Sequence, residues 1–281
     1  MKRIWITGAQ GHVGSALTKL LDCTKYQLSL TDIDDVDITC TDQVIQFARI
    51  NRPDVIINCA SLTNVEECAR NMDRAYQVNA LGVRNVAIAA NSVNAKVIHL
   101  STDDVFDQES AIPYNEFDAV HPKTIYGKSK AAGEQLLTQL MNRFVIIRSC
   151  WVYGVGHDFV NDVLEAAKKG GSMDVPNNSY AAPTSAAELA KVVAYFIEHQ
   201  EVGMYHVVCR GSCSRYEFAR AILEYAGQTD RLTLNPVLDK DENRPTYSVL
   251  DNMMLRLSGI PEPKEWRVAL KEYIEETGGL E

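Results

Sequence analysis

Short runs of apolar residues alternate with segments of helical spacing through the first 150 residues of the chain. Five runs have the composition of buried strands, and they span residues 3–7, 26–31, 54–59, 96–100 and 144–148. Between them, apolar residues recur with helical spacing over residues 12–21, 43–50, 75–90 and 126–141. Strands that are apolar throughout are typical of a parallel sheet covered by helices on both faces. The pattern therefore predicts an α/β fold with a doubly wound, Rossmann-type parallel sheet.

The alternation of apolar runs and helical segments ends after residue 150, where glycine and proline residues interrupt the pattern. Helical spacing recurs over residues 188–198 and 215–226, and residues 235–263 are rich in loop-forming residues. We expect residues 1–150 to form the first domain. Residues 151–281 are expected to form a smaller, partly interleaved lobe, with segments that return to pack on the first domain.

The charge balance excludes some classes of partner. The 281 residues carry a net charge of −9, and no run of Lys or Arg is longer than Lys168-Lys169. A nucleic-acid-binding chain is expected to carry a basic excess or stripe, so we expect no nucleic-acid partner. No apolar run approaches the ~20 residues that cross a bilayer, and residues 1–7 are too short for a signal-peptide core. We therefore expect a cytoplasmic protein without a membrane partner.

Seven cysteines are scattered through apolar segments, with no CxxC pair and no zinc spacing. Cys209 and Cys213 lie four residues apart, but no second Cys or His pair accompanies them. We expect reduced thiols, as in a reducing compartment, and no metal site.

A glycine loop follows the first predicted strand and opens the first predicted helix. Gly8, Gly11 and Gly14 form a GxxGxxG pattern, which by itself is also compatible with a simple turn. Its position between strand and helix is what a pyrophosphate-binding turn requires, because the phosphates must approach the backbone where a Cβ would block them. The loop therefore predicts that residues 1–150 bind a dinucleotide, NAD(P).

Acidic residues follow the second predicted strand, where a Rossmann fold binds the adenosine ribose. Asp32 comes 24 residues after Gly8, and further aspartates follow at Asp34, Asp35 and Asp37. For two of the four, a solvated acidic turn is the alternative interpretation. Residues 31–41 contain no Arg or Lys that would bind a 2′-phosphate. NADH and NADPH both remain open as cofactors, and the local charge favours NADH slightly.

Tyr126 and Lys130 are spaced to share one face of a predicted helix, one turn apart. Carbonyl reduction needs a proton donor, and a free phenol has a pKa about three units above neutrality. An ammonium ~4 Å away contributes about 4 kcal/mol at an effective dielectric constant of ~20, which would lower that pKa substantially. The alternative is an exposed helix pair without function.

Ser101 and Thr102 end the strand at 96–100, at the sheet edge where open parallel sheets bind ligands. A hydroxyl there would hold the substrate oxygen against Tyr126. The alternative is a strand-end hydroxyl that caps the next turn.

Together these motifs resemble the extended short-chain dehydrogenase/reductases, and the resemblance covers nearly the whole chain. The most specific matches are the runs at 101–107, 126–130, 148–154, 182–184 and 244–250. The resemblance implies NAD(P)H-dependent reduction of the 4-keto group of a dTDP-activated deoxyhexose, in the synthesis of cell-surface polysaccharide precursors. We also expect that the chain forms a homodimer.

The resemblance also implies the roles of individual residues. The catalytic residues would be Thr102, Tyr126 and Lys130. Those that bind the cofactor would be Gly8, Gln10, Gly11, His12, Val13, Gly14, Asp32, Asp37, Ile38, Cys59, Ala60, Ser61, Asn79, Ser101, Tyr126 and Lys130. Those that bind the substrate would be Thr102, Asp103, Asp104, Val105, Trp151, Phe159 and Arg244, with Arg244 reaching the diphosphate. For Trp151, packing within the lobe is the alternative.

Two departures from the family pattern lie on the substrate side. Asp104 stands where the family usually has a Tyr that touches the sugar, and residues 177–182 lack the usual Gln-x-Gly pattern. The resemblance therefore implies reductase chemistry more specifically than the identity of the sugar. Two alternatives stay open: a related epimerase or dehydratase, which needs a further acid/base group, and an inactive NAD(P)-binding regulatory subunit. The intact Thr102, Tyr126 and Lys130 count against the second.

Overall fold

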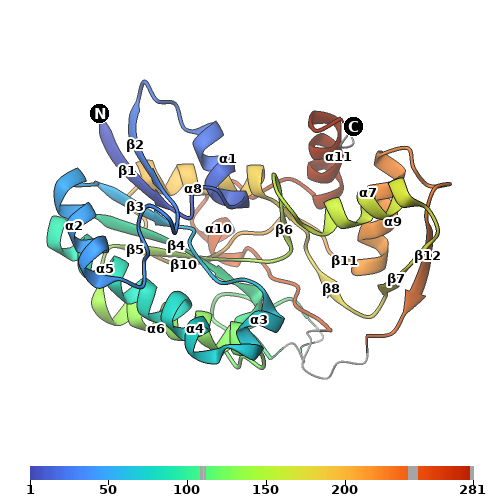
Figure 1. Ribbon diagram of the computed structural model, residues 1–281, viewed down its shortest axis with the longest axis horizontal. Helices are drawn as coiled ribbons and strands as arrows, with labels where there is room; N and C mark the ends of the chain where they lie inside the picture. Colours follow the sequence, from blue (N-terminus) through green and yellow to red (C-terminus); the bar gives the residue numbers. More distant parts are fainter. Residues whose placement is uncertain (108–109, 111, 240–245, 279–281) are drawn as a thin grey trace.

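The computed structural model describes residues 1–107, 110, 112–239 and 246–278. The predicted site residue Arg244 lies outside the described residues. A six-stranded sheet, in the order β10-β5-β4-β3-β1-β2, forms the centre of the molecule (Figure 1). All its strand pairs are parallel. The strands are β1 (Lys2–Thr7), β2 (Tyr26–Thr31), β3 (Val55–Asn58), β4 (Lys96–Thr102), β5 (Phe144–Ser149) and β10 (Gly203–His206). The predicted fold class is confirmed.

Helices cover both faces of this sheet. The first face carries α1 (His12–Leu20) and α8 (Ala186–Glu198), and the other carries α2 (Thr41–Asn51), α5 (Val83–Val93) and α6 (Ile125–Leu140). β1 shows how the strands serve both layers, because Ile4 and Ile6 pack in the core beneath α1 and α8 whereas Trp5 packs in the core on the opposite face. This two-sided burial explains why the strands are apolar throughout.

The order in which the chain adds strands to the sheet reverses between β1 and β3. The chain leaves β1 through α1 to β2 at the sheet edge, then returns through α2 to β3 on the far side of β1. The carboxyl ends of β1 and β3 therefore flank a topological switch point, where open α/β sheets bind ligands.

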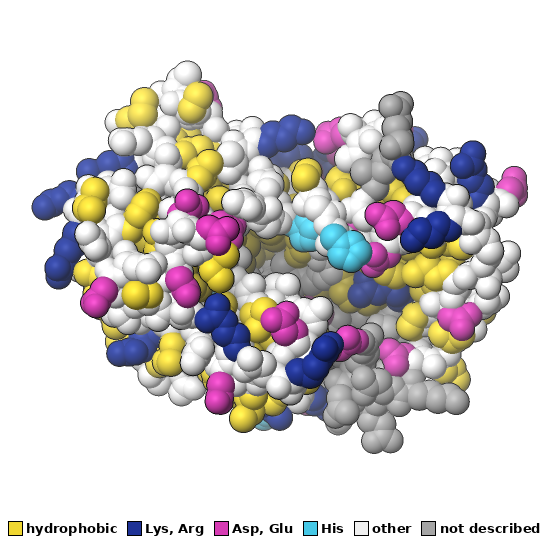
Figure 2. All heavy atoms as spheres, viewed as in Figure 1, with side chains coloured by type: hydrophobic (Ala, Val, Ile, Leu, Met, Phe, Trp, Pro, Cys, Tyr) yellow, Lys and Arg dark blue, Asp and Glu magenta, His cyan; other side chains and the backbone are white. Residues whose placement is uncertain are grey.

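Residues after 150 contribute both to this sheet and to a second group of elements. β10 and α8 belong to the central sheet and its covering layer. Leu255 and Ile260 also belong to the core beneath α1 and α8, and much of the remainder packs around a separate core that contains Phe218 and Trp266 (right side of Figure 1). Its elements are α7 (Phe159–Lys169), α9 (Arg215–Tyr225), α11 (Trp266–Glu276), β6 (Val152–Tyr153), β7 (Ser172–Pro176), β8 (Tyr180–Ala181), β9 (Thr184–Ser185), β11 (Cys213–Ser214) and β12 (Thr233–Val237). Figure 2 shows the surface hollowed where the two parts meet. A domain boundary at residue 150 stays a prediction.

Two expectations differ from the structure. The helix expected over residues 75–90 is interrupted: α3 (Val65–Arg70) and α4 (Met72–Tyr76) precede a π-helical segment at Gln77–Gly82, and α5 follows. π-Helical turns are frequent at functional sites, and this one contains Asn79. The region expected to be loop-rich, residues 235–263, contains the end of β12, which pairs with β7, and α10 (Met253–Leu257).

The seven cysteines are free thiols, as expected. Within the described ranges, no helix is long and apolar enough to cross a membrane.

Candidate active site

The glycine loop lies at the switch point with its backbone packed tightly. Gly8 has a φ of +63°, and a Cβ on it would lie 2.7 Å from Ala60 N. A Cβ on Gly14 would lie 2.3 Å from Gly8 O, whereas one on Gly11 would make an ordinary 3.4 Å contact. No side chain caps the N-terminus of α1. The loop thus has the shape and the exposed helix N-terminus that a pyrophosphate needs.

The other predicted residues of this loop have distinct surroundings. Gln10 is exposed, Val13 is buried in the core beneath α1, and His12 Nδ1 lies 2.8 Å from Val155 O. His12 therefore joins the glycine loop to the segment that leads from β6 into α7. The side chain of Val13 belongs to the core and is not placed to touch a cofactor.

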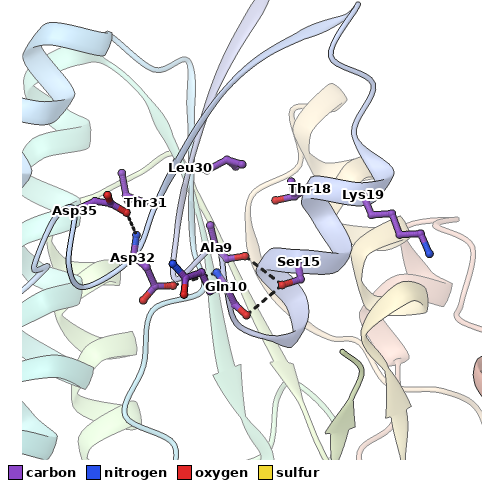
Figure 3. Close-up of a pocket in the computed structure, with 9 residues that line it drawn as sticks. All are labelled: Ala9, Gln10, Ser15, Thr18, Lys19, Leu30, Thr31, Asp32 and Asp35. Carbon is purple, nitrogen blue, oxygen red and sulfur yellow. Dashed lines mark hydrogen bonds between the residues drawn. The ribbon is translucent and has the colours of Figure 1, made fainter. Parts of the chain in front are cut away.

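A pocket of about 470 Å³ adjoins the glycine loop at the end of β2 (Figure 3). Asp32 Oδ2 accepts the Gln10 backbone N–H at 3.1 Å, and Oδ1 accepts the Ile33 N–H at 2.9 Å. Lys19 also lines this pocket, with its side chain extending along α1 away from Asp32 (Figure 3). A basic residue therefore reaches the neighbourhood from α1, which the composition of residues 31–41 does not reveal.

Asp37 and Ile38 are held by local contacts. Asp37 Oδ1 accepts hydrogen bonds from the backbone N–H and hydroxyl of Thr39 at 2.9 and 2.8 Å. The side chain of Ile38 is buried, and a Cβ on Gly82 would lie 2.7 Å from its Cδ1. Ile38 therefore packs in the core, and only its backbone could adjoin an adenine.

Asn79 organises the loop that follows β3. Its Oδ1 accepts the Ser61 hydroxyl at 3.0 Å and the Leu62 N–H at 2.8 Å, while its Nδ2 donates to Leu62 O and to Ser129 Oγ. Cys59 and Ala60 lie just before this loop, and Ala60 packs against Gly8. Asn79 thereby ties the end of β3 to α6.

Tyr126 lies in the first turn of α6, which Thr124 caps by accepting the Gly127 N–H at 2.8 Å. A Cβ on Gly127 would lie 2.0 Å from Asp104 O, so glycine lets the helix approach the end of β4 this closely. Burial raises the pKa of Tyr126, the charge of Asp104 raises it further, and a hydrogen bond with Thr102 opposes this rise. The spacing of Tyr126 to Lys130 predicts an acidified phenol. In this structure that part is wrong, because burial and the neighbouring carboxylates dominate.

Lys130 is buried one turn later, at 2% exposure. Its Nζ donates to Leu100 O at 2.6 Å and to Ser61 Oγ at 3.4 Å, and neither partner is the phenol. Burial lowers the pKa of Lys130 to about 8, while the charge of Glu134 opposes this fall. Lys130 thus joins the end of β4 to the loop that follows β3.

Glu134, which was not among the predicted site residues, belongs to the same buried network. Arg148 Nε and Nη2 donate to its two oxygens at 3.0 and 2.7 Å, and Ser101 Oγ donates to Oε1 at 2.5 Å. Ser101 therefore points at Glu134. The spacing of Glu134, four residues after Lys130, was the one sequence signal that could have placed it on the same helix face.

Two adjacent buried carboxyl groups follow Thr102. Thr102 Oγ1 donates to Asp103 Oδ1 at 3.0 Å, and Thr124 Oγ1 donates to Asp104 Oδ2 at 3.2 Å. Burial raises the pKa of Asp103 to about 7, and the charge of Asp104 adds to this rise. Val105 is fully buried in a core cluster with Phe106, so its side chain does not face the hollow.

Trp151 and Phe159 belong to the lobe formed after β5, where both pack against its core. Trp151 has a φ of +42°, a region that non-glycine residues rarely adopt and that often marks functional sites. The guanidinium of Arg215, a residue that sequence reasoning missed, stacks on both rings. Both predicted aromatic residues therefore share one cationic partner.

A glycine cradle at the switch point of a parallel sheet, beside a Tyr/Lys pair and a strand-end hydroxyl, defines a short-chain dehydrogenase/reductase of the extended type. The family model described as RmlD substrate binding domain matches residues 1–278. The chain belongs to this family.

Three proteins show how closely the likeness extends. Spore coat polysaccharide biosynthesis protein SpsK of Bacillus subtilis is 35% identical over 280 residues, 98% of each chain. dTDP-4-dehydrorhamnose reductase of Aggregatibacter actinomycetemcomitans is 35% identical over 287 residues, 96% of this chain and 98% of its own. The crystal structure of dTDP-4-dehydrorhamnose reductase from Bacillus anthracis in complex with NADP has a TM-score of 0.96 at 37% identity, covering 99% of this chain and 100% of that chain.

Proposed function

We propose that this chain reduces the 4-keto group of a dTDP-activated deoxyhexose with NAD(P)H, converting dTDP-4-dehydro-L-rhamnose to dTDP-L-rhamnose. The observation that carries this proposal is the convergence of Thr102, Tyr126 and Lys130 at the carboxyl end of β4. The names and the full-length similarity of the relatives support the same substrate class. A role in the synthesis of polysaccharide precursors fits these relatives.

The residues present fit a nicotinamide dinucleotide. Gly8 and Gly14 leave a cradle that a Cβ would fill, and the uncapped N-terminus of α1 lies beside it. The glycine loop would hold the pyrophosphate, Asp32 the adenosine ribose, and Lys130 with Ser61 the nicotinamide side. When bound, the cofactor supplies the hydride.

Tyr126 acts as the proton donor in this proposal. Its raised pKa keeps the phenol protonated at neutral pH, which is the form that a reduction consumes. Thr102 lowers the pKa of the phenol, so its hydroxyl lies close enough to hold the substrate oxygen beside Tyr126. As hydride reaches the carbonyl carbon, the proton passes from Tyr126 Oη to the carbonyl oxygen. Lys130, one helical turn away, stabilises the phenolate that remains.

One observation favours an epimerase as a second candidate. Asp103, whose pKa is raised to about 7, and its neighbour Asp104 both act on the charge state of Tyr126. Such a carboxyl pair is the further acid/base group that an epimerase needs. Incubation with the keto sugar in deuterated water distinguishes the two candidates, since epimerisation incorporates deuterium at carbon without consuming NAD(P)H.

A direct test mixes the purified protein with dTDP-4-dehydro-L-rhamnose and NADH or NADPH, and follows the loss of reduced nicotinamide by absorbance. We expect stoichiometric conversion to dTDP-L-rhamnose. A protein that binds the cofactor but reduces no keto sugar would instead be the regulatory subunit. The cytoplasmic location and the homodimer remain predictions.

A further inference from the structure

The guanidinium of Arg215 lies over two aromatic rings that pack against the core of the lobe. Its guanidinium carbon is 3.6 Å from the ring centroid of Trp151 and 4.6 Å from that of Phe159. Phe218 stacks against both rings from the lobe core, with ring centroids at 6.5 and 5.8 Å. The half-buried guanidinium is therefore held in place by a packed aromatic group.

The strand register places this cation at the catalytic edge of the sheet. Ser149, the last residue of β5, pairs with Thr102, the last residue of β4. Trp151 follows Ser149 by two residues, so its backbone leaves the sheet at the edge where Thr102 ends β4. The guanidinium that lies over the Trp151 ring thus contacts one of the first residues that leave this edge of the sheet.

The lobe brings other substrate-side segments to the same place. The backbone N–H of Arg215 donates to Ser179 O at 2.9 Å, and β11 pairs with β8 directly before it. On the other side of β8, Tyr180 bridges to Tyr247, just beyond the undescribed segment that contains Arg244. Arg215 therefore adjoins β8, whose other neighbour is Tyr247.

The charges of the two sides complement a nucleotide sugar. Asp103 and Asp104 lie on the sheet side, where they suit sugar hydroxyls and would repel phosphate. The negative charge of Asp104 favours a diphosphate on the side of the lobe, where Arg215 brings positive charge. Stacking uses the faces of a guanidinium, whereas its N–H donors lie in the plane, so ring stacking and phosphate binding are compatible.

We propose that Arg215 binds the diphosphate of the nucleotide-sugar substrate, with Trp151 and Phe159 fixing its guanidinium plane. This inference rests on the proposed function and adds the residue that recognises the charged part of the substrate. The pyrophosphate of the cofactor is a second source of the same chemistry, and it is tested separately because it belongs at the glycine loop.

The experiment compares the affinities of dTDP and thymidine by calorimetry for the wild type, Arg215→Met and Arg215→Lys. We expect Arg215→Met to weaken dTDP binding about 10- to 100-fold, the scale of a charge-assisted hydrogen bond, and to leave thymidine and NADPH binding unchanged. Arg215→Lys should retain part of the preference for dTDP. Arg220→Met, on the exposed side of the same helix, is the matched control and should bind all three ligands as the wild type does.

The outcomes separate this inference from the proposed function. A wild type that prefers dTDP over thymidine, together with an Arg215→Met variant that keeps the full preference, would overturn the role of Arg215 alone. Equal weakening of dTDP and thymidine would also overturn it, since that result indicates a purely structural brace. A wild type that binds dTDP no better than thymidine would overturn the proposed substrate class, and this inference with it.

Discussion

Glu134 lies one helical turn beyond Lys130 on α6, and both side chains are buried, at 4% and 2% exposure. The carboxylate is fixed by Arg148 and Ser101, so it cannot turn away from the helix face that carries Tyr126 and Lys130. Its charge opposes the effect of burial on the pKa of Lys130. Glu134 is therefore a positioning residue that helps to keep the ammonium charged.

Replacing Glu134 by Gln should move the alkaline limb of the pH–rate profile to lower pH. Loss of the negative charge disfavours the protonated ammonium, so the pKa of Lys130 falls below its present value of about 8. The check is kcat/KM for keto-sugar reduction across pH 6–10, with exposed Lys128→Gln as the control that should leave the limb in place. An unshifted limb would exclude this electrostatic role.

The same substitution leaves the buried guanidinium of Arg148 without its ion pair. Breaking a buried pair from one side typically costs about 3–5 kcal/mol of stability. Urea unfolding of Glu134→Gln measures this loss, and a Glu134→Gln/Arg148→Met double variant should recover part of it. If the double variant lost as much stability relative to the wild type as the two single variants lose together, the two residues would not be coupled.

Gly14→Ala should destabilise the fold and weaken cofactor binding, whereas Gly11→Ala should leave stability nearly unchanged. A Cβ at Gly14 meets Gly8 O at 2.3 Å, but a Cβ at Gly11 meets the same atom at 3.4 Å. Overpacking of this kind costs about 1–3 kcal/mol. Thermal unfolding and NADPH titration of both variants check the contrast, and equal stability losses would show that the loop is not packed as described.

Titration of Asp103 should lower the free energy of unfolding as pH rises toward neutrality. Burial raises its pKa from 3.8 to about 7, so the folded state binds this proton more tightly than the unfolded chain does. The stabilisation is present below pH ~4 and is lost as pH rises to about 7. Denaturant unfolding at several pH values should show this slope in the wild type and a flatter curve in Asp103→Asn. An identical slope in both proteins would assign the titration to another group.

Asp32→Asn should shift cofactor preference toward NADPH. The substitution removes a negative charge beside the expected ribose site, in a pocket that Lys19 also lines. We expect the ratio of the NADH and NADPH dissociation constants to rise several-fold in the variant, and Lys19→Gln to change it in the opposite direction. Fluorescence titration measures both constants, and an unchanged ratio would place the ribose away from Asp32.

The sequence predicted those parts of the molecule that depend on local pattern. The alternation of apolar runs located β1 to β5 to within about two residues, and the glycine loop and the helix that carries Tyr126 were found where expected. The sixth strand, β10, was missed because four residues between loops carry no periodic signal. The π-helical turn at Asn79 was missed because it keeps the apolar spacing of an ordinary helix.

Contacts between distant segments account for the remaining misses. Arg215 meets Trp151 and Phe159 only when the lobe folds, and no spacing in the chain encodes that meeting. The direction of the pKa shift at Tyr126 was wrong for the same reason. The pKa of Tyr126 depends on the burial of the phenol and on the charge of Asp104. Neither can be inferred from the helical spacing of Tyr126 and Lys130.

The central claim is that Tyr126 donates the proton during keto-sugar reduction. Single-turnover reduction of dTDP-4-dehydro-L-rhamnose by Tyr126→Phe, with NADPH binding measured in the same preparation, tests it most directly. The account predicts cofactor binding like that of the wild type and a rate at least ~100-fold lower, the usual scale of general acid catalysis. A variant that binds NADPH and reduces the sugar at the wild-type rate would contradict it.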